Sequence, residues 1–219
     1  PRFGLHVPGS LERVSVETYI HDRFAKVHHA EVQHFLPNII SLRCSGEYSA
    51  AVGLAPASTG KLFAEQYLDA PVEQIISQKL GVTIPRDQIV EIGNLVSTWK
   101  GSSLLLFIVI GEVMKRLGYH YVMFTGTREV KALLARLRYS PVVLTDANPA
   151  ALPDGGVSWG SYYSNHPQVM FGDNRPAMDA ARKNPMYRAT VATISGAIAK
   201  LCDEFRTANT TTLQNINHD

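Results

Sequence analysis

The sequence is poor in the residues that mark several special classes of protein. Only two of its 219 residues are cysteines, and Cys44 and Cys202 lie far apart without metal or redox spacing. Its 21 basic residues nearly balance its 19 acidic ones, and no dense run of lysine and arginine occurs. We therefore expect two free thiols in a reducing compartment, and we expect no nucleic-acid partner.

Long hydrophobic runs are missing as well. The longest, at residues 104–110, is far shorter than the roughly 20 residues that span a bilayer. The chain starts at Pro1 without a charged-then-apolar leader, although trimming of the N-terminus would hide one. These two absences predict a soluble cytoplasmic protein and give little support to membrane association.

What the sequence has is an ordinary globular balance, with 45% hydrophobic and 18% charged residues. Periodicity and turn residues predict strands at 2–7, 35–43, 47–55, 88–97, 119–125 and 140–145, and shorter ones at 157–163 and 168–171. Helices are predicted at 11–30, 71–81, 102–117 and 128–138, with a helical tail at 175–205 and a frayed end at 206–219. This order predicts an α/β fold with a mixed sheet, because a hairpin precedes a strand–helix–strand–helix–strand series.

Two residues next to these elements carry expectations of their own. Pro37 lacks a backbone N–H, so it would restrict the strand at 35–43 to a sheet edge or a bulge. Asp69 would cap the helix that begins near Pro71.

The stretch IVEIGNLVSTWKGSS, residues 89–103, gathers polar groups around a predicted strand end. Val90 and Ile92 share one face of the strand, but the next apolar residue, Leu95, has the other parity. One extra residue near positions 93–94 explains the change. The sequence therefore predicts a β-bulge there, which turns backbone N–H groups out of the ladder.

Glu91 and Asn94 are the candidates for chemistry in this stretch. Glu91 would act as a general base toward an amine, directly or through water, if burial raises its pKa. Asn94 would anchor the substrate. The alternative is that Glu91 lies at a sheet edge or pairs with an arginine such as Arg86.

Lys100, Gly101, Ser102 and Ser103 follow at the predicted start of a helix. The free N–H groups and the positive end of a helix attract phosphate, so these four residues are candidates for binding the pyrophosphate of an acyl donor. They would equally serve as an ordinary turn.

The order of hairpin, helix, bulged strand, anion-binding turn, helix and strand resembles the GNAT acetyltransferase superfamily. The resemblance implies a GNAT-like mixed central sheet flanked by helices, with the thioester of a donor against the bulged strand. The turn has one glycine, Gly101, where the superfamily has several, and this fits the branch that takes longer acyl groups. Residues 1–172 would form this domain and residues 173–219 a C-terminal helical extension with a polar tail.

Two segments resemble the acyl-homoserine-lactone synthases. LFAEQYLDAPVEQII, residues 62–76, is similar to their acidic segment, which holds S-adenosylmethionine. This likeness implies that Glu65 and Asp69 bind the amine acceptor, although a helix cap and a solvated glutamate explain them too. Arg86 would bind an acceptor carboxylate, or pair with Glu91 or Asp87.

The strand motif of those synthases, Glu-x-Ser-Arg, is matched by Glu91 but has Gly93 and Asn94 at its last two positions. A fuller match is to the thermostable hemolysin family of bacteria. LFAEQYLDAPVE, VEIGNLVS, VMFTGT, WGSYY and HPQVMFG resemble that family's segments in the family's order, over roughly residues 30–172.

The resemblance implies an acyltransferase that moves an acyl group to an amine acceptor, which is amino-acid-like or S-adenosylmethionine-like. The co-substrate would be an acyl-CoA or an acyl carrier protein thioester, with no bound cofactor. The alternatives are a membrane-active hemolysin-type protein and a non-catalytic acyl-binding protein.

Further candidates lie on the next strand and beyond. Thr125 and Thr127 follow a strand at the edge where parallel sheets present ligands, although Thr127 would also serve as a helix cap. Tyr162 would protonate a departing thiolate or form part of a wall. Apolar walls for an acyl tunnel, or simply core, would come from Phe63, Leu104, Phe107, Val122 and Phe124.

Three histidines near Glu31 invite a metal interpretation: His28, His29 and His34. Two adjacent histidines cannot face one way on a helix, and the sequence shows no second cluster of ligands. We therefore expect no metal.

Overall fold

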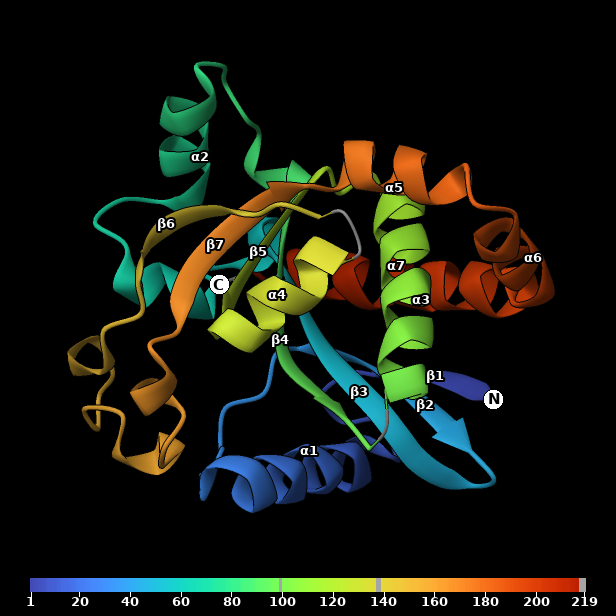
Figure 1. The fold of residues 1–219 in the computed structure, drawn as a ribbon, viewed down its shortest axis with the longest axis horizontal. Coiled ribbons are helices and arrows are strands. Elements are labelled where there is room, and N and C mark those ends of the chain that lie inside the picture. Colours follow the sequence, from blue (N-terminus) through green and yellow to red (C-terminus); the bar gives the residue numbers. More distant parts are fainter. Residues whose placement is uncertain (99, 137–138, 217–219) are drawn as a thin grey trace.

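The computed structural model describes residues 1–98, 100–136 and 139–216. These residues form one seven-stranded mixed sheet with helices packed on it (Figure 1). The strands are β1 (Arg2–His6), β2 (Asn38–Cys44), β3 (Glu47–Pro56), β4 (Ile89–Ser97), β5 (Tyr121–Gly126), β6 (Val142–Asp146) and β7 (Gln168–Asp173). Their order in the sheet is β1-β2-β3-β4-β5-β7-β6. β4 and β5, which helix α3 connects, pair in parallel, and all other neighbouring strands pair antiparallel. The mixed α/β sheet that the sequence predicts is confirmed.

The helices are α1 (Arg13–His28), α2 (Val72–Leu80), α3 (Lys100–Leu117), α4 (Arg128–Arg136), α5 (Asn174–Arg182), α6 (Pro185–Thr193) and α7 (Ser195–Ile216). None of the helices in the described part of the chain combines the length and the hydrophobicity needed to cross a lipid bilayer. Both cysteine thiols are free, as predicted.

Several element predictions are wrong. β2 is the second strand of the sheet rather than an edge, because β1 pairs with it. β2 does have a register shift against β3, but the shift lies between Leu42 and Arg43 and not at Pro37, which falls just before the strand. Asp69 caps nothing, since Pro71 occupies the N-cap of α2. The segment 206–216, predicted to fray, continues α7.

Residues 157–163 form short 3-10 turns instead of a strand. Gly160 has a left-handed φ of 54°. A Cβ at this position would lie 2.2 Å from the carbonyl oxygen of His28, so the loop packs its backbone directly on the end of α1.

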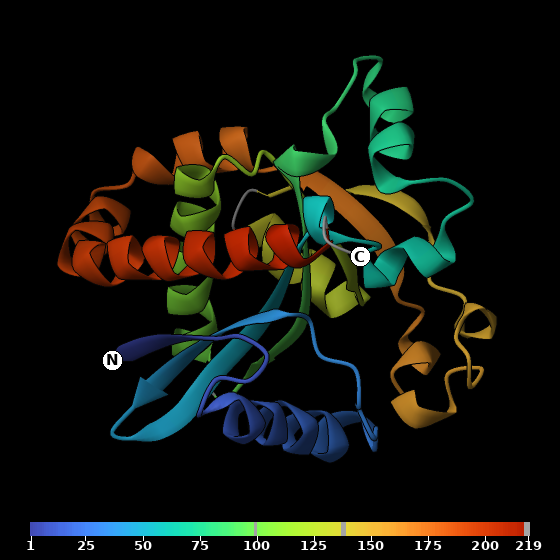
Figure 2. The same ribbon diagram turned by 180° about the vertical axis from the view of Figure 1, so that it is seen from behind.

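Helices cover both faces of the sheet, and strand alternation decides which residues meet them. On one face Val52, Leu54, Val90 and Val122 pack with α3, α4 and α7 in a single cluster. The tail helix α7 belongs to this cluster and crosses α3 (Figure 2). The division of the chain at residue 172 stays a prediction.

The opposite face is covered by two separate groups of residues. α1 packs on it through Val16 and Ile20, which meet Ile39 and Ala51 of the sheet. α2 and the 3-10 helix Phe63–Tyr67 pack farther along, against strands β4, β5 and β7.

β4 and β5 separate at the middle of the sheet, and β4 has its bulge there. Their pairing runs from Ile89–Tyr121 to Ile92–Phe124, and in the described chain no ladder contact joins them beyond it. On its other side β4 shifts register against β3 between Gly93 and Val96. The predicted bulge is thus confirmed, and it lies where the two parallel strands come apart.

Candidate active site

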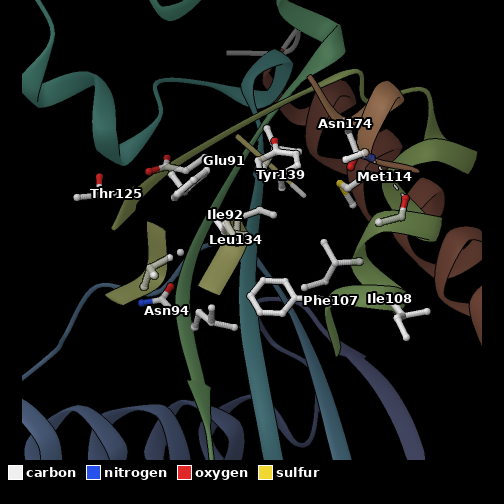
Figure 3. A pocket seen from close by; sticks show the side chains of 18 of the residues that line it. Glu91, Ile92, Asn94, Phe107, Ile108, Met114, Thr125, Leu134, Tyr139 and Asn174 are labelled. Atoms are coloured by element: carbon white, nitrogen blue, oxygen red, sulfur yellow. Dashed lines mark hydrogen bonds between the residues drawn. The ribbon is translucent and has the colours of Figure 1, made fainter. Parts of the chain in front are cut away.

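A cavity of about 890 Å³ lies at this separation of β4 and β5. Glu91 and Ile92 both line it, although neighbouring side chains on a strand point to opposite faces of the sheet. The cavity therefore passes between the strands and connects the two faces. Figure 3 shows its lining from Glu91 and Thr125 at one side to Met114 and Asn174 at the other, with Ile92 and Leu134 between them.

The two ends of the cavity differ in chemistry. The end on the α3 face is mostly apolar and is lined by residues of α3, α4, α5 and α6. All five residues that the sequence suggests as walls line the cavity at one end or the other: Phe63, Leu104, Phe107, Val122 and Phe124. The other end, which we call the aromatic end, is lined by Phe24, His28, His34, Phe63, Trp159 and Tyr162.

Glu91 lies where the two ends meet. Its side chain is 3% exposed, and its two carboxylate oxygens accept hydrogen bonds from the backbone N–H groups of Phe63 (2.7 Å) and Ala64 (3.0 Å). Burial raises the pKa of Glu91 to about 7, although these two bonds act in the opposite direction. A carboxylate of this kind is partly ionised at neutral pH, which suits a general base.

Asn94 lines the cavity from the bulge, with a left-handed φ of 50° that asparagine tolerates better than most residues. Its amide accepts a bond from the N–H of Leu36 (2.9 Å) and donates one to the carbonyl of His34 (3.0 Å). Gly53 leaves room for this contact, because a Cβ there would lie 2.8 Å from the Asn94 oxygen. Asn94 thus holds the segment of His34 at the cavity, and its role as a substrate anchor stays a prediction.

Glu65 is also buried, but it has a cation. Arg86 donates to both of its oxygens, at 2.7 and 2.8 Å, and to Glu73 at 2.6 Å. Burial opposes ionisation of Glu65, but the bonds from Arg86 and from the N–H groups of Val72 and Leu62 outweigh it and lower the pKa to about 2.

The predicted acceptor residues are therefore not brought together at the cavity. Glu65 and Arg86 neutralise one another, whereas the sequence suggested Glu91 or Asp87 as partners for Arg86. Asp69 is exposed, and none of the three is among the described residues that line the cavity. Their part in acceptor binding stays a prediction.

The predicted anion site is the first turn of α3. Ser102 is 1% exposed and its hydroxyl has no partner among the described residues, while the hydroxyls of Ser103 and Ser97 bond one another. Lys100 begins the helix, but its side chain lies outside the described part of the structure. Gly101, Ser102 and Ser103 sit beside the cavity without lining it.

Thr125, Thr127 and Tyr162 all line the cavity, and the roles that the sequence suggests for them stay predictions. Tyr162 donates to the backbone carbonyl of Thr125 (3.3 Å), and burial raises its pKa well above the ordinary value. Thr127 immediately precedes α4, so it also stands at the cap position.

The sequence suggests His28 and His34 only as metal ligands, yet both line the aromatic end of the cavity. Partial burial lowers the pKa of each, so both imidazoles are neutral at neutral pH. No periodic signal points to them, because they reach the cavity from the end of α1 and from an irregular segment.

This fold recurs in proteins of known structure. TofI, in a ternary complex with an inhibitor and MTA, is 14% identical over 82% of this chain and 97% of its own, with a TM-score of 0.54. FeeM, an N-acyl amino acid synthase from uncultured soil microbes, is 10% identical over 81% and 93%, with a TM-score of 0.54.

A third similar structure is BjaI, a CoA-dependent acyl-homoserine lactone synthase with SAM and isopentyl-CoA. It is 13% identical over 90% of each chain, with a TM-score of 0.51. The GNAT-like fold implied by the sequence is confirmed by these likenesses.

No curated protein matches the sequence. The sequence model of one family, described as thermostable hemolysin, matches residues 7–178. This range takes in the bulged strand, α3 and the aromatic loop at 157–163. The chain belongs to the thermostable hemolysin family.

Proposed function

We propose that this protein is an N-acyltransferase, which moves an acyl group from a CoA or carrier-protein thioester to an amine. The observation that carries the proposal is the cavity that passes between β4 and β5 and has Glu91 at its middle. An acyl chain fits its apolar end and an amine its aromatic end, which brings the two reactants together beside a carboxylate. The likeness in fold to BjaI and FeeM supports this reaction class.

The chemistry follows from the state of Glu91. Its carboxylate takes a proton from the ammonium form of the acceptor, and the free amine attacks the thioester carbonyl carbon. Backbone N–H groups of residues 93–97 that point away from β3, and that β5 does not pair, stabilise the oxyanion. The C–N bond forms and the C–S bond breaks, and the proton that the nitrogen loses ends on the thiolate, so the products are an amide and a free thiol.

The donor's anionic end has a proposed place at the first turn of α3. The first N–H groups of a helix lack intrahelical partners and attract phosphate. Gly101, Ser102 and Ser103 supply such groups next to the point where β4 ends. A donor held there has its thioester at the separation of the two strands.

Thiol release tests the proposal. Wild type is offered acyl-CoAs and acyl carrier protein thioesters of graded chain length, with and without pooled amines. We expect release that depends on the amine, and a fall of about 100-fold or more in Glu91→Gln, because the variant keeps the shape of the side chain but cannot take a proton.

Glu112→Gln is the matched control. Glu112 is 0% exposed, pairs with Arg182 and does not line the cavity, so the substitution removes an equally buried carboxylate from another part of the core. Release without an amine, equal loss in both variants, or no release from any donor would contradict the proposal.

A further inference from the structure

The acceptor side of the cavity is an assembly of rings from four separate parts of the chain. Phe24 and His28 come from α1, His34 from the segment before β2, Phe63 from a 3-10 helix, and Trp159 and Tyr162 from the loop after β6. Their centroids are close: Trp159 lies 6.0 Å from Phe24, 5.9 Å from Phe63 and 5.4 Å from Tyr162. His34 stacks on Phe63 at 4.8 Å and is exposed, so the aromatic end opens to solvent beside it.

The charges at this end have one sign. Among the described residues that line the whole cavity, Glu91 is the acid and Lys183 the cation, and Lys183 lies at the far, α5 end. His28 and His34 are neutral, because partial burial of their rings lowers the pKa of each below its ordinary value. The nearest arginine on α1, Arg23, donates to the carbonyl of Ser97 and does not line the cavity.

Several polar groups that could receive a carboxylate are already engaged, and those that are free are neutral hydroxyls. The hydroxyls of Tyr67 and Tyr163 bond one another, which leaves one O–H free to donate, and the hydroxyl of Tyr162 donates to a backbone carbonyl. The hydroxyl of Thr125 has no partner among the described residues. The amide of Asn94 is bonded to the segment of His34, and Arg86 is bonded to Glu65 and Glu73. An anion here would lie against ring faces without a cation.

The energies of the two kinds of ligand differ in sign. Burying an unpaired carboxylate among apolar groups is strongly unfavourable, whereas a cation over an aromatic face is attracted by the ring. Glu91 adds a negative charge at the inner end of the ring assembly.

We infer that the acceptor is a primary amine that carries no carboxylate, with a flat or cationic body that lies against these rings. The inference rests on the proposed acyl transfer and names its acceptor class. It separates this protein from enzymes that acylate amino acids, since those must bind a carboxylate beside the reacting nitrogen.

The test compares acceptors that differ in one group, with thiol release as the readout and the best acyl donor held constant. Phenethylamine, phenylalaninamide and phenylalanine share a ring and an amine, and the third alone carries a carboxylate. We expect kcat/KM for each of the first two to exceed that for phenylalanine at least tenfold. S-adenosylmethionine, which carries both a cation and a carboxylate, should also be a poor acceptor.

A designed cation sharpens the test. His34→Arg places a guanidinium at the open aromatic end and leaves the bond from Asn94 intact, because that bond goes to the backbone of residue 34. The ratio of kcat/KM for phenylalanine to that for phenethylamine should rise about tenfold or more. His21→Arg adds the same charge on α1 away from the cavity and should leave the ratio unchanged.

The outcomes separate the two proposals. Turnover of phenylalanine equal to or above that of phenethylamine overturns the acceptor class and leaves acyl transfer standing. An unchanged ratio in His34→Arg also overturns it. Failure of every acceptor with every donor overturns acyl transfer, and the acceptor class with it.

Discussion

Two buried glutamates, Glu91 and Glu65, share a setting and differ in charge state. Glu91 is 3% exposed and Glu65 7%, and each accepts two backbone N–H bonds. Yet the pKa of Glu91 rises to about 7 while that of Glu65 falls to about 2. A main difference is Arg86, which bonds to both oxygens of Glu65 and makes no bond to Glu91, whose pKa is raised by burial and further by the nearby charge of Glu65.

Burial and hydrogen bonds alone do not make a carboxylate a purely structural group. With a guanidinium, Glu65 is a permanent charge that fixes the 3-10 helix Phe63–Tyr67 to α2. Glu91 has no guanidinium partner, so it changes protonation near neutral pH although the same 3-10 helix donates hydrogen bonds to it. The 3-10 helix Phe63–Tyr67 thus contains the permanently charged Glu65 and also donates backbone N–H groups to the reactive carboxylate of Glu91.

The largest expected effect comes from removing the cation. Arg86→Leu leaves Glu65, with 5% of its side chain exposed, and Glu73 without the cation that pairs with them. We expect the free energy of unfolding to fall by about 4 kcal/mol, as for other broken buried pairs. Urea denaturation at pH 7 measures it.

Arg175→Leu serves as the control for that loss. Arg175 pairs with Asp173 at the surface, with 52% of its side chain exposed, so its removal should cost less than about 1 kcal/mol. An Arg86 variant of wild-type stability and raised acceptor KM would instead favour the acceptor role that the sequence suggests.

The second prediction concerns stability against pH. Because folding raises the pKa of Glu91 from 4.5 to about 7, its contribution is fully present below pH 4.5 and is lost as the pH rises through 7. Glu91→Gln has no such loss. Relative to wild type, its free energy of unfolding should rise by about 3 kcal/mol between pH 4.5 and pH 8.

Glu65→Gln should behave in the opposite way. The lowered pKa of Glu65 stabilises the fold above pH 4.5, and this contribution is lost as the pH falls toward 2. The deficit of this variant should therefore be full at pH 7 and shrink in acid. Parallel pH dependences of the two variants would contradict the comparison.

The third prediction concerns turnover. If Glu91 acts as a base with a pKa of about 7, kcat/KM should rise about 30-fold between pH 5.5 and pH 8 and then level off. Stopped assays of thiol release at constant ionic strength measure the profile. In Glu91→Gln this rise of kcat/KM with pH should disappear. If the rise remained, the titrating group would be a residue other than Glu91.

Much of this site follows from local sequence. The change of apolar parity between Ile92 and Leu95 predicts the bulge, and the apolar periods predict the strands and helices around it. Glu91 stands out because a carboxylate in a buried strand needs an explanation. These signals depend on residues close together in the sequence, so one sequence is enough to detect them.

The pairing of charges and the assembly of rings do not follow in this way. Arg86 meets Glu65 and Glu73 because a 3-10 helix and α2 fold back over it, and no spacing in the sequence fixes that contact. VSWGSYY reads as a strand, but Gly160 lies against the end of α1 and turns the segment into a loop. That loop brings Trp159 to Phe24, and with it the aromatic end.

The smallest expected effect comes from giving Glu91 the cation that it lacks. Tyr67 lines the cavity near Glu91, so Tyr67→Lys would place an ammonium beside the carboxylate. An opposite charge at such a distance lowers a carboxylate pKa by about 1 or more. The kinetic pKa should then fall from about 7 toward 6, which raises kcat/KM at pH 6 about fivefold relative to its plateau. The control is Tyr67→Met, which removes the same hydroxyl without adding a charge and should leave the kinetic pKa near 7. A shift of equal size in both variants would mean that the bond between Tyr67 and Tyr163, rather than the added charge, sets the pKa of Glu91.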